Sequence, residues 1–464
     1  MKKTAYILLA ALGFASCNYL EIEPVGKVIP HKVSEYRALL TTGYYNYSSF
    51  SVTTYIGLLS DEIGSLDQSQ FSDSNEGVAL SYNLTWQYGS QMRELPYQDC
   101  YRSIFYATAV IDEVMGADAD TSGESKEQIL GEAYAMRAYL HFALVNLYGQ
   151  PYNSATAATD RGVPISNNID IEQKYRPANV AAVYRQILDD IEQAENYLTV
   201  ENYLNLEVTE RAKLNYRFTR DALQALKARV MLYMRNWQEA YDAATALLPK
   251  YKLVDFNTKV ETNALPWKAT SEEAILAWER PFNGAKNDLI YAGLLSDEIL
   301  GLFDPDTDKR RSHIGAAYAY DENWTPTQIG YRPNNRSSSD RVSLRIAEMY
   351  LIAAEAGSYL TGELDNAKGY LLALQKMRFT PEGYTAKETA VEAMTAEQFQ
   401  TEVANDRARE LLIEGHRWFD LRRTTQPSIV HTSDGQTYTL YQSDSRYTLP
   451  FPQSAINNNP ELNN

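Results

Sequence analysis

The sequence predicts a mostly α-helical fold, in which tetratricopeptide-like helical pairs form a scaffold and irregular, loop-rich insertions form a second lobe. Apolar residues recur at three- and four-residue spacing over much of the 464-residue chain, which is the period of an amphipathic helix. Two alanine-rich pairs of segments, at 219–248 and 343–378, each contain a short turn in the middle. By contrast, 44–95 and 251–340 lack helical periodicity over most of their length.

The N-terminus has the pattern of a targeting segment rather than of folded structure. Two lysines precede an apolar run over residues 5–14, which is too short to span a bilayer as a helix. Residues 14–17, Phe-Ala-Ser-Cys, match a bacterial lipobox, with phenylalanine where leucine is usual. We therefore expect 1–16 to be a lipoprotein signal peptide and Cys17 to carry a diacylglycerol, followed by a lipid tether over 17–30. A plain secretory signal with an incidental cysteine is the alternative.

Cysteine content and charge narrow the class of protein. The chain has 2 Cys, so a lipidated Cys17 leaves Cys100 without an internal partner, and the fold must rest on packing. The net charge of −17 argues against nucleic acid as a partner, because its phosphates would be repelled. Tyrosine is enriched, with 35 Tyr against 13 Phe and 6 Trp. A tyrosine ring suits wet binding surfaces, although most of these rings are expected to lie between helices.

The N-terminal part, 31–250, contains a series of expected helices. They cover 32–41, 97–115, 127–148, 180–198, 219–234 and 237–248. The helix at 127–148 has a clear end, because Gly149 suits the position just beyond a helix and Pro151 cannot continue one. Within this part, 44–95 is rich in Tyr, Ser, Asn and Asp, and its aromatic residues argue against disorder.

The C-terminal part, 341–464, repeats the helical-pair pattern, with helices expected at 343–360 and 364–378. In both pairs the second helix begins with a large apolar residue and has alanine three positions on. These residues are Trp237 and Ala240 in the first pair, and Leu364 and Ala367 in the second. Small residues let antiparallel helices approach closely, which is the basis of tetratricopeptide-like packing.

The insertion 251–340, expected to contribute to a ligand-binding face, contains an aspartate-rich run at 303–310. Three aspartates in this run have the spacing with which a calcium-binding EF-hand loop begins. However, Lys309 and Gly315 stand where that loop requires glycine and glutamate. The run therefore predicts an aspartate-rich turn rather than a calcium site.

Residues 405–423 are expected to form one amphipathic helix, with Phe419 on its apolar stripe. Gly415 weakens such a helix by about 1 kcal/mol relative to alanine, which makes sense where another backbone packs closely. His416 and Asp420 are four positions apart and could in principle hold a metal ion, but no further ligand lies nearby in the sequence. We favour a packing role for this segment.

The run 407–423, R-x-R-E-L-L-x-E-G-H-R-W-F-D-L-R-R, resembles the late signature of the SusD/RagB family, outer-membrane lipoproteins of Bacteroidetes that capture nutrients. Further segments resemble family segments in the same order, namely 18–24, 131–149, 303–310 and 449–460. The resemblance therefore spans nearly the whole chain. It implies that the late signature is mainly a scaffold element and that the tail is an extended strand with proline stops.

The resemblance also implies a location and partners. The protein would be lipid-anchored in the outer membrane and face the cell surface, because acidic tethers in the family accompany export to the outer leaflet. It would sit as a lid over a SusC-like TonB-dependent barrel and deliver oligosaccharides to it. Binding and release would need no cofactor and no metal.

Chemical motifs are missing from the sequence, which has no G-x-S-x-G, H-E-x-x-H, Walker or C-x-x-C pattern. Carboxylates are plentiful but none stand out as a glycosidase pair, so no catalytic residues and no enzyme activity are expected. Sugar rings instead stack on aromatic rings, while their hydroxyls pair with polar side chains. The candidate ligand-binding residues are Trp86, Tyr88, Trp267, Tyr291 and Trp324. Each could instead anchor a core or a loop, and stacking requires that Trp86 or Trp324 be partly exposed.

We expect the irregular ranges 44–95 and 251–340 to meet on one face, away from the helical pairs. Three alternatives to an oligosaccharide-binding protein stay open at this point. The first has the same architecture with a peptide ligand, as in RagB-like relatives. The second is a lipid-anchored glycoside hydrolase, and the third is a helical-repeat scaffold without a small ligand.

Overall fold

The computed structural model describes residues 30–49, 55–67, 75–89, 92, 94–170, 173–280, 293–334, 336–337 and 339–463. These ranges do not include the expected signal peptide 1–16, Cys17, the expected tether as far as residue 29, or Tyr291. Within the described ranges, no helix is both long and apolar enough to cross a membrane.

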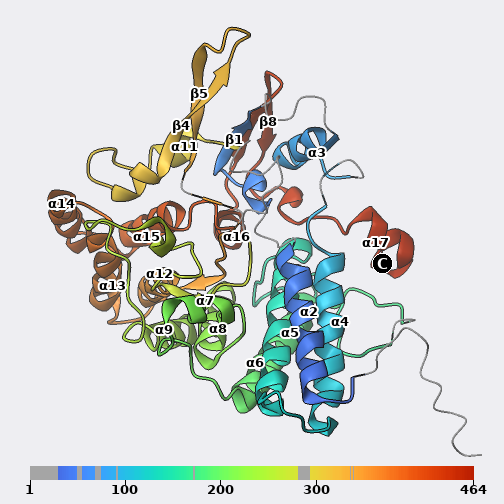
Figure 1. Cartoon of the computed structure of the whole chain (residues 1–464). Coiled ribbons are helices and arrows are strands. Elements are labelled where there is room, and N and C mark those ends of the chain that lie inside the picture. The colour runs from blue at the N-terminus through green and yellow to red at the C-terminus, as the bar shows by residue number, and fades with distance from the viewer. Residues whose placement is uncertain are drawn as a thin grey trace, which may run out of the picture.

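Helices of the N-terminal part form a bundle at the lower right of Figure 1. They are α2 (Val33–Ser49), α4 (Gln98–Glu113), α5 (Lys126–Tyr148) and α6 (Val180–Tyr197). α5 packs against both α4 and α6, and α2 packs on α4. Because α5 is surrounded, nearly all of its residues are buried. The side chain of Ser125 accepts the Gln128 NH to begin α5, which ends at Gly149 as the sequence predicted.

A second group of helices packs beside this bundle and contains both predicted pairs (Figure 1). Its members are α8 (Arg220–Tyr233), α9 (Trp237–Thr245), α12 (Ile346–Gly357), α13 (Leu364–Lys376), α14 (Pro381–Glu392) and α15 (Ala396–Glu410). α9 contacts both α8 and α12, so the two pairs are neighbours in space. At Gly357, a Cβ would lie 3.0 Å from Ala367 and from the ring of Tyr241. This close contact confirms the prediction of small residues between paired helices.

Helices also occur where the sequence showed little periodicity. These are α3 (Asn75–Leu84), α7 (Val208–Leu214), α11 (Asp297–Leu300) and the 3-10 turns η2 (Ile56–Leu59) and η6 (Lys309–His313). Together with the predicted helices they confirm a mostly α-helical fold.

The described strands pair into four antiparallel two-stranded sheets. The pairs are β1 (Ile63–Leu66) with β3 (Gly293–Leu295), β2 (Ala274–Leu276) with β6 (Leu344–Arg345), β4 (Ile314–Tyr320) with β5 (Pro326–Pro333), and β7 (Ile429–Ser433) with β8 (Gln436–Leu440). β1 also contacts β7, and β3 contacts β5. The sheets β1–β3, β4–β5 and β7–β8 therefore lie together, above the helices in Figure 1. Because β1 belongs to 44–95 and β3 to 251–340, the two irregular ranges meet, as expected.

The single helix expected at 405–423 is wrong. α15 ends before this segment is complete, and a separate helix, α16 (Arg417–Arg423), follows a turn. In the turn, Ile413 and Gly415 have φ of 57° and 83°, in the left-handed region. Glycine adopts this conformation without steric cost, so the turn accounts for Gly415 through its backbone conformation. The turn is fixed by Glu62, whose Oε1 accepts the Ile413 NH at 2.7 Å.

The expectation for the tail is wrong, whereas the prediction for the aspartate-rich run is confirmed. The tail is not the extended strand implied by the resemblance, because residues 453–463 form α17 (Gln453–Asn458) and a 3-10 turn. Pro452 has φ of −57° at the start of α17, where a missing NH costs nothing, so it begins a helix and does not stop a strand. In the run 303–310, Asp304 accepts the NH groups of the residues two and three positions on, which confirms a turn.

Candidate ligand-binding groove

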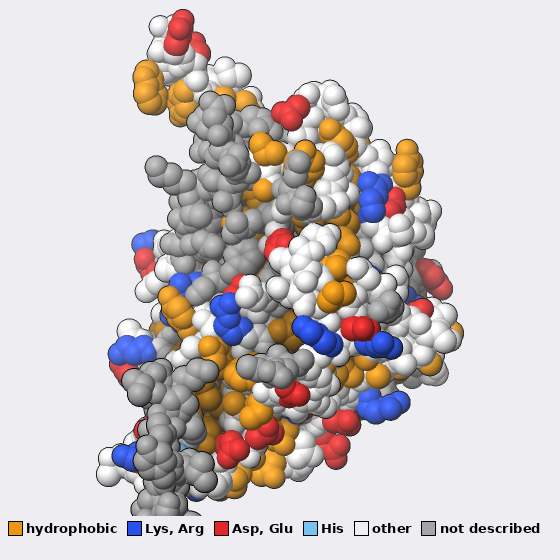
Figure 2. All heavy atoms as spheres, turned by 90° about the vertical axis from the view of Figure 1, so that its right-hand side faces the viewer, with side chains coloured by type: hydrophobic (Ala, Val, Ile, Leu, Met, Phe, Trp, Pro, Cys, Tyr) orange, Lys and Arg blue, Asp and Glu red, His pale blue; other side chains and the backbone are white. Residues whose placement is uncertain are grey.

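A groove of about 580 Å³ lies between α4, the connection from α5 to α6, and α17. Figure 2 looks onto the side of the molecule that carries α17 in Figure 1, and hydrophobic side chains are visible there among charged ones. The groove is lined by Glu94, Tyr97, Gln98, Tyr101, Arg102, Phe105, Pro164, Ser166, Asn168, Asp170, Gln173, Lys174, Tyr175, Ser454, Ala455, Asn458, Asn459 and Leu462.

Three aromatic rings form one wall of the groove. Tyr97, Tyr101 and Phe105 are four positions apart, so successive turns of α4 place them on one face. The ring centroids of Tyr97 and Tyr101 are 4.8 Å apart. The Tyr101 hydroxyl donates to the Pro164 carbonyl at 2.8 Å, which holds that ring against the opposite connection. All three side chains are half-buried, so each ring is supported by the fold and still reaches the groove.

Amide side chains form the facing wall. Asn168 Nδ2 donates to Gln173 Oε1 at 2.8 Å, and the Tyr175 hydroxyl donates to Asn168 Oδ1 at 3.0 Å. Asn459 Nδ2 donates to the Tyr175 carbonyl at 2.7 Å, which joins the C-terminal segment to the connection. These contacts orient the polar groups of the wall before any ligand is present.

The electrostatic character of the groove is close to neutral, because Glu94 and Asp170 are accompanied by Arg102 and Lys174. Burial raises the pKa of the Tyr97 hydroxyl and that of Tyr101 above the usual range, so the phenols stay protonated and can donate hydrogen bonds. Aromatic faces opposite amides and hydroxyls can stack on a sugar ring and pair with its hydroxyls.

Trp86 is not a stacking platform, and that prediction is wrong. Its side chain is only 1% exposed, and its Nε1 donates to the Leu59 carbonyl at 3.0 Å. The ring stacks on His431, with the centroids 4.3 Å apart. A ring enclosed on both faces stabilises the junction of α3 and β7 and leaves no surface for a ligand.

Trp267 and Tyr88 also serve the fold. Trp267 is 6% exposed, and the Arg336 guanidinium lies 3.5 Å from its ring centroid. The prediction of a ligand-stacking role is therefore wrong for Trp267 as well. Tyr88 is half-buried, and its hydroxyl donates to the Arg446 carbonyl at 2.9 Å, so its polar tip is already used. Tyr291 lies outside the described residues.

Trp324 is the predicted residue whose ring is open to solvent. It lies at the end of the β4–β5 hairpin and is 80% exposed. Tyr320 is 57% exposed, and its ring centroid lies 6.1 Å from that of Trp324. The hairpin end projects at the top of Figure 2 and carries hydrophobic and acidic side chains. It is separate from the groove, and a ligand-binding role for Trp324 stays a prediction.

Two family models match this chain. One, described as "Starch-binding associating with outer membrane", matches residues 18–232, and the other, described as "SusD family", matches residues 318–464. The chain belongs to the SusD/RagB-like family. It is 22% identical to SusD-like protein P2 of Formosa agariphila, in an alignment that covers 99% of this chain and 98% of the relative.

Solved structures of SusD-like proteins share the fold. A SusD superfamily protein from Bacteroides thetaiotaomicron has a TM-score of 0.74 and 21% identity, over 93% of this chain and 99% of that protein. A protein titled "Laminarin binding SusD-like protein" has a TM-score of 0.61 and 17% identity, over 92% of this chain and 98% of that protein. At these identities the likeness establishes the fold alone.

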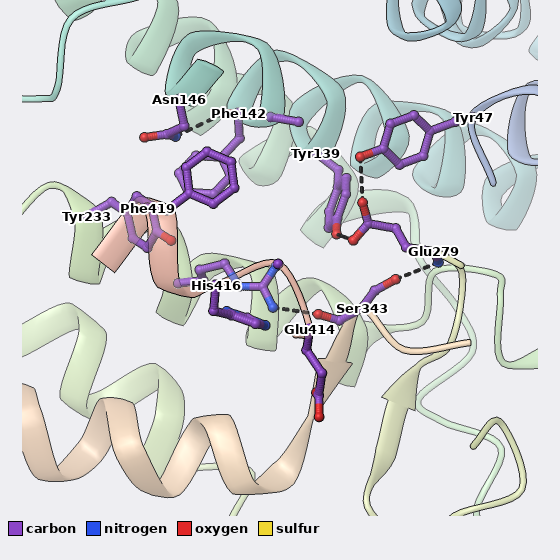
Figure 3. Close-up of a pocket in the computed structure, with 13 residues that line it drawn as sticks. Tyr47, Tyr139, Phe142, Asn146, Tyr233, Glu279, Ser343, Glu414, His416 and Phe419 are labelled. Carbon is purple, nitrogen blue, oxygen red and sulfur yellow. Dashed lines mark hydrogen bonds between the residues drawn. The ribbon is translucent and has the colours of Figure 1, made fainter. Parts of the chain in front are cut away.

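An interior pocket of this SusD-like protein brings carboxylates and tyrosines together (Figure 3). Glu279 accepts hydrogen bonds from the hydroxyls of Tyr47 and Tyr139, each at 2.5 Å, and burial raises its pKa. Glu414, also in the lining, is paired with Arg345 at 2.9 Å. The pocket volume is about 40 Å³, which is about the room that one water molecule needs. A glycosidase pair needs space for a sugar between its carboxylates, and this pocket has none.

His416 lines the same pocket as a neutral ring. Its Nδ1 lies 3.8 Å from Glu348 Oε1, and burial lowers the His416 pKa to about 3. Asp420, its suggested partner, is paired with Arg407 at 2.9 Å. Among the residues that the structure describes, no group of three or more His, Cys, Asp or Glu is placed to hold a metal ion. Phe419 is half-buried in the lining, so it is less enclosed than the apolar stripe predicted.

Proposed function

We propose that this protein is a cell-surface lipoprotein that binds oligosaccharides in the groove and delivers them to a SusC-like TonB-dependent outer-membrane transporter. The observation that carries the proposal is the groove along α4, where three aromatic rings face a wall of amides. Its volume of about 580 Å³ suits a ligand of a few sugar units. One protein with the same fold, the laminarin-binding SusD-like protein, is named for a glycan ligand.

Binding in this groove is physical and needs no chemical step. The half-buried rings of Tyr97 and Phe105 offer apolar surface to the C–H faces of sugars, while Asn168 and Gln173 offer donors and acceptors to hydroxyls. The groove is open along one side of the molecule, so a bound chain can leave without a large rearrangement of the fold. Such a ligand is released unchanged, which is what delivery to a transporter requires.

The match of residues 14–17 to a lipobox supports the location that we propose. An anchor at Cys17 followed by an acidic tether would hold the groove near the membrane surface and place the protein as a lid over the barrel. Capture of a tagged SusC-like barrel together with this protein from solubilised membranes tests the partnership. A protein that purifies alone from cells expressing the neighbouring barrel gene would count against it.

The proposal is tested by calorimetry with a panel of neutral plant, microbial and host polysaccharides, laminarin included. Phe105→Ala removes a half-buried ring from the groove wall, so we expect the affinity for the bound polysaccharide to fall at least tenfold, or about 1.4 kcal/mol. Tyr441→Ala is the matched control, because Tyr441 is an exposed aromatic outside the groove. It should bind like the unmodified protein.

Other outcomes would indicate a different binding site, a different ligand or an enzyme activity. Loss of binding in Trp324→Ala but not in Phe105→Ala would place the ligand on the β4–β5 hairpin. Binding of a peptide library with no response to any polysaccharide would support the peptide alternative. Release of reducing sugar by the purified protein would show an enzyme.

A further inference from the structure

A second surface pocket, of about 680 Å³, lies beside the first part of the α5–α6 connection. Its walls are 150–160, the turn 234–236 between α8 and α9, and 422–426 at the end of α16. The polar residues of its lining are Gln150, Asn153, Ser154, Thr156, Asp160, Arg235, Asn236, Arg422, Arg423, Thr424 and Gln426. Tyr152 is the one aromatic residue of this lining among the residues that the structure describes, so the pocket offers hydrogen bonds rather than stacking surfaces.

Several of these side chains use one polar atom in a hydrogen bond within the protein and keep another polar atom available to a ligand. Asn153 Oδ1 accepts a main-chain NH two residues on at 3.0 Å, which leaves its Nδ2 as a donor. Gln426 Nε2 donates to the Arg422 carbonyl at 3.1 Å, which leaves its Oε1 as an acceptor. Arg235 Nη2 donates to the Arg423 carbonyl at 2.9 Å, which leaves two guanidinium nitrogens without a partner in the described part of the chain.

The backbone of the pocket is also preset. Arg235 and Gln426 have φ of 59° and 44°, a left-handed conformation that non-glycine residues keep only when their surroundings hold them. The segment after α5 folds on itself, with the Ala157 NH on the Asn153 carbonyl at 2.7 Å, and is tied to α6 by the Ala181 NH on the Ala157 carbonyl at 2.9 Å. The backbone that carries the pocket is therefore ordered before a ligand binds, and this reduces the entropy cost of binding.

The charges of the pocket decide what kind of ligand fits. Arg422 is buried and donates to the carbonyls of Tyr447 and Gly149, so it neutralises the carbonyl end of α5. Arg423 is paired with Glu355 at 2.5 Å and with Asp420 at 2.8 Å.

Arg235 and Asp160 remain in the lining, and their charges are opposite. The carbonyl ends of α8 and α16 also reach this pocket, and their partial negative charge opposes an anionic ligand. The pocket thus provides donors and acceptors in similar number without a strong field of either sign. A neutral ligand suits it better than an ion.

We propose that this pocket is a second carbohydrate-binding site, which takes a neutral, hydroxyl-rich sugar through hydrogen bonds. Each sugar hydroxyl both donates and accepts, and the pocket sets the donors of Asn153 and Arg235 beside the acceptors of Gln426 and Asp160. The inference rests on the proposed glycan binding for the identity of its ligand. It differs from the groove in its means of recognition, because the groove works by stacking.

The test is calorimetry with laminaritriose and with the neutral trisaccharide of every panel polysaccharide that binds. The doubly substituted variant Asn153→Ala/Arg235→Asn removes both donors, and asparagine tolerates the left-handed backbone at position 235. We expect the unmodified protein to bind two trisaccharides and this variant to bind one. Phe105→Ala should bind one trisaccharide with unchanged affinity at the pocket and the other at least tenfold more weakly in the groove. Arg185→Asn, which removes an exposed arginine from α6, is the control and should bind two.

The outcomes separate this inference from the proposed function. A pocket variant that binds as many trisaccharides as the unmodified protein, with the same affinity, overturns the second site and leaves the groove intact. Complete loss of trisaccharide binding in Phe105→Ala would also overturn the second site. Tighter binding of an acidic trisaccharide at this pocket would refute its neutral specificity. If no panel member binds the unmodified protein, the proposed function fails and the second site with it.

Discussion

Glu62 is the buried carboxylate that holds the turn between α15 and α16. It is 1% exposed, and besides the Ile413 NH it meets the Ser60 hydroxyl at 3.3 Å. Asp61 and Arg417, paired at 2.7 Å, lie beside it. Burial raises the pKa of Glu62 from its ordinary value of 4.5 to about 8, so the folded protein keeps this carboxyl protonated at neutral pH.

We predict that Glu62 makes stability fall as pH rises. Between about pH 4.5 and pH 8 the folded chain binds a proton here that the unfolded chain has released, so the contribution is complete below pH 4.5 and is lost as pH rises through 8. Its slope is at most about 1.4 kcal/mol per pH unit. Glu62→Gln lacks this contribution. Urea denaturation from pH 5 to 8 should show that the free energy of unfolding falls less with pH in this variant than in the unmodified protein. A difference that does not change with pH would mean that Glu62 is ionised in the fold.

At the scale of single elements, α13, α15 and β6 are joined by buried ion pairs. Glu410 on α15 meets Arg345 of β6 at 2.7 Å, Arg378 after α13 at 2.8 Å, and Arg310 of η6 at 3.1 Å. The arginines hold the pKa of Glu410 well below its usual range, although burial alone would raise it. Glu273 also pairs with Arg378, at 2.6 Å. Through these ion pairs, segments that are distant in sequence pack against the late signature, residues 407–423. This packing explains its role as a scaffold element.

We predict that Glu410→Ala destabilises the fold by about 3–5 kcal/mol, because it leaves buried guanidinium groups short of a counter-charge. Denaturant unfolding of the purified variant measures this loss. Glu392→Ala, on the exposed end of α14, should change stability by less than about 0.5 kcal/mol. A Glu410 variant as stable as the control would mean that the ion pairs contribute little to holding α15 in place.

At the scale of the whole molecule, one apolar core joins the two groups of helices. Trp278 lies at this junction, with its ring centroid 5.0 Å from that of Tyr44, 5.3 Å from Tyr139 and 6.0 Å from Phe218. The groove borders α4 of the N-terminal bundle. The sheets β1–β3, β4–β5 and β7–β8 lie above this bundle in Figure 1. Both groups of helices therefore share one continuous core.

We predict that Cys17→Ala releases the protein from membranes, because the Ala-Ser-Cys run that precedes the tether would no longer accept a lipid. Fractionation of cells that lack the partner barrel measures the effect. The fold should be unchanged, as the near-ultraviolet circular dichroism of the released protein would show. Retention of the variant in the membrane fraction would contradict the lipobox.

Local sequence pattern predicted the long helices of the N-terminal bundle and of the two helical pairs. The helix that became α5 was predicted almost to the residue, because its apolar period, its glycine end and its following proline all lie within one segment. The pairs at 219–248 and 343–378 were predicted from their alanine-rich apolar period and the short turn within each pair. The signature run at 407–423, with the other segments that resemble family segments, was enough to indicate the SusD/RagB family.

Only the tertiary structure decided which aromatic residues face solvent and where the chain turns within 405–423. Trp86 and Trp324 lie in similar polar surroundings in the sequence, yet His431, from far along the chain, stacks on the Trp86 ring, whereas Trp324 is 80% exposed. Glu62 likewise fixes the turn at Ile413 from a distant segment. The groove was missed because its second wall, 164–175 with α17, is brought to Tyr97 and Tyr101 by packing alone. Whether a residue is buried, and whether a groove forms, depends on contacts between distant segments. The periodicity of a local stretch of sequence carries no information about such contacts.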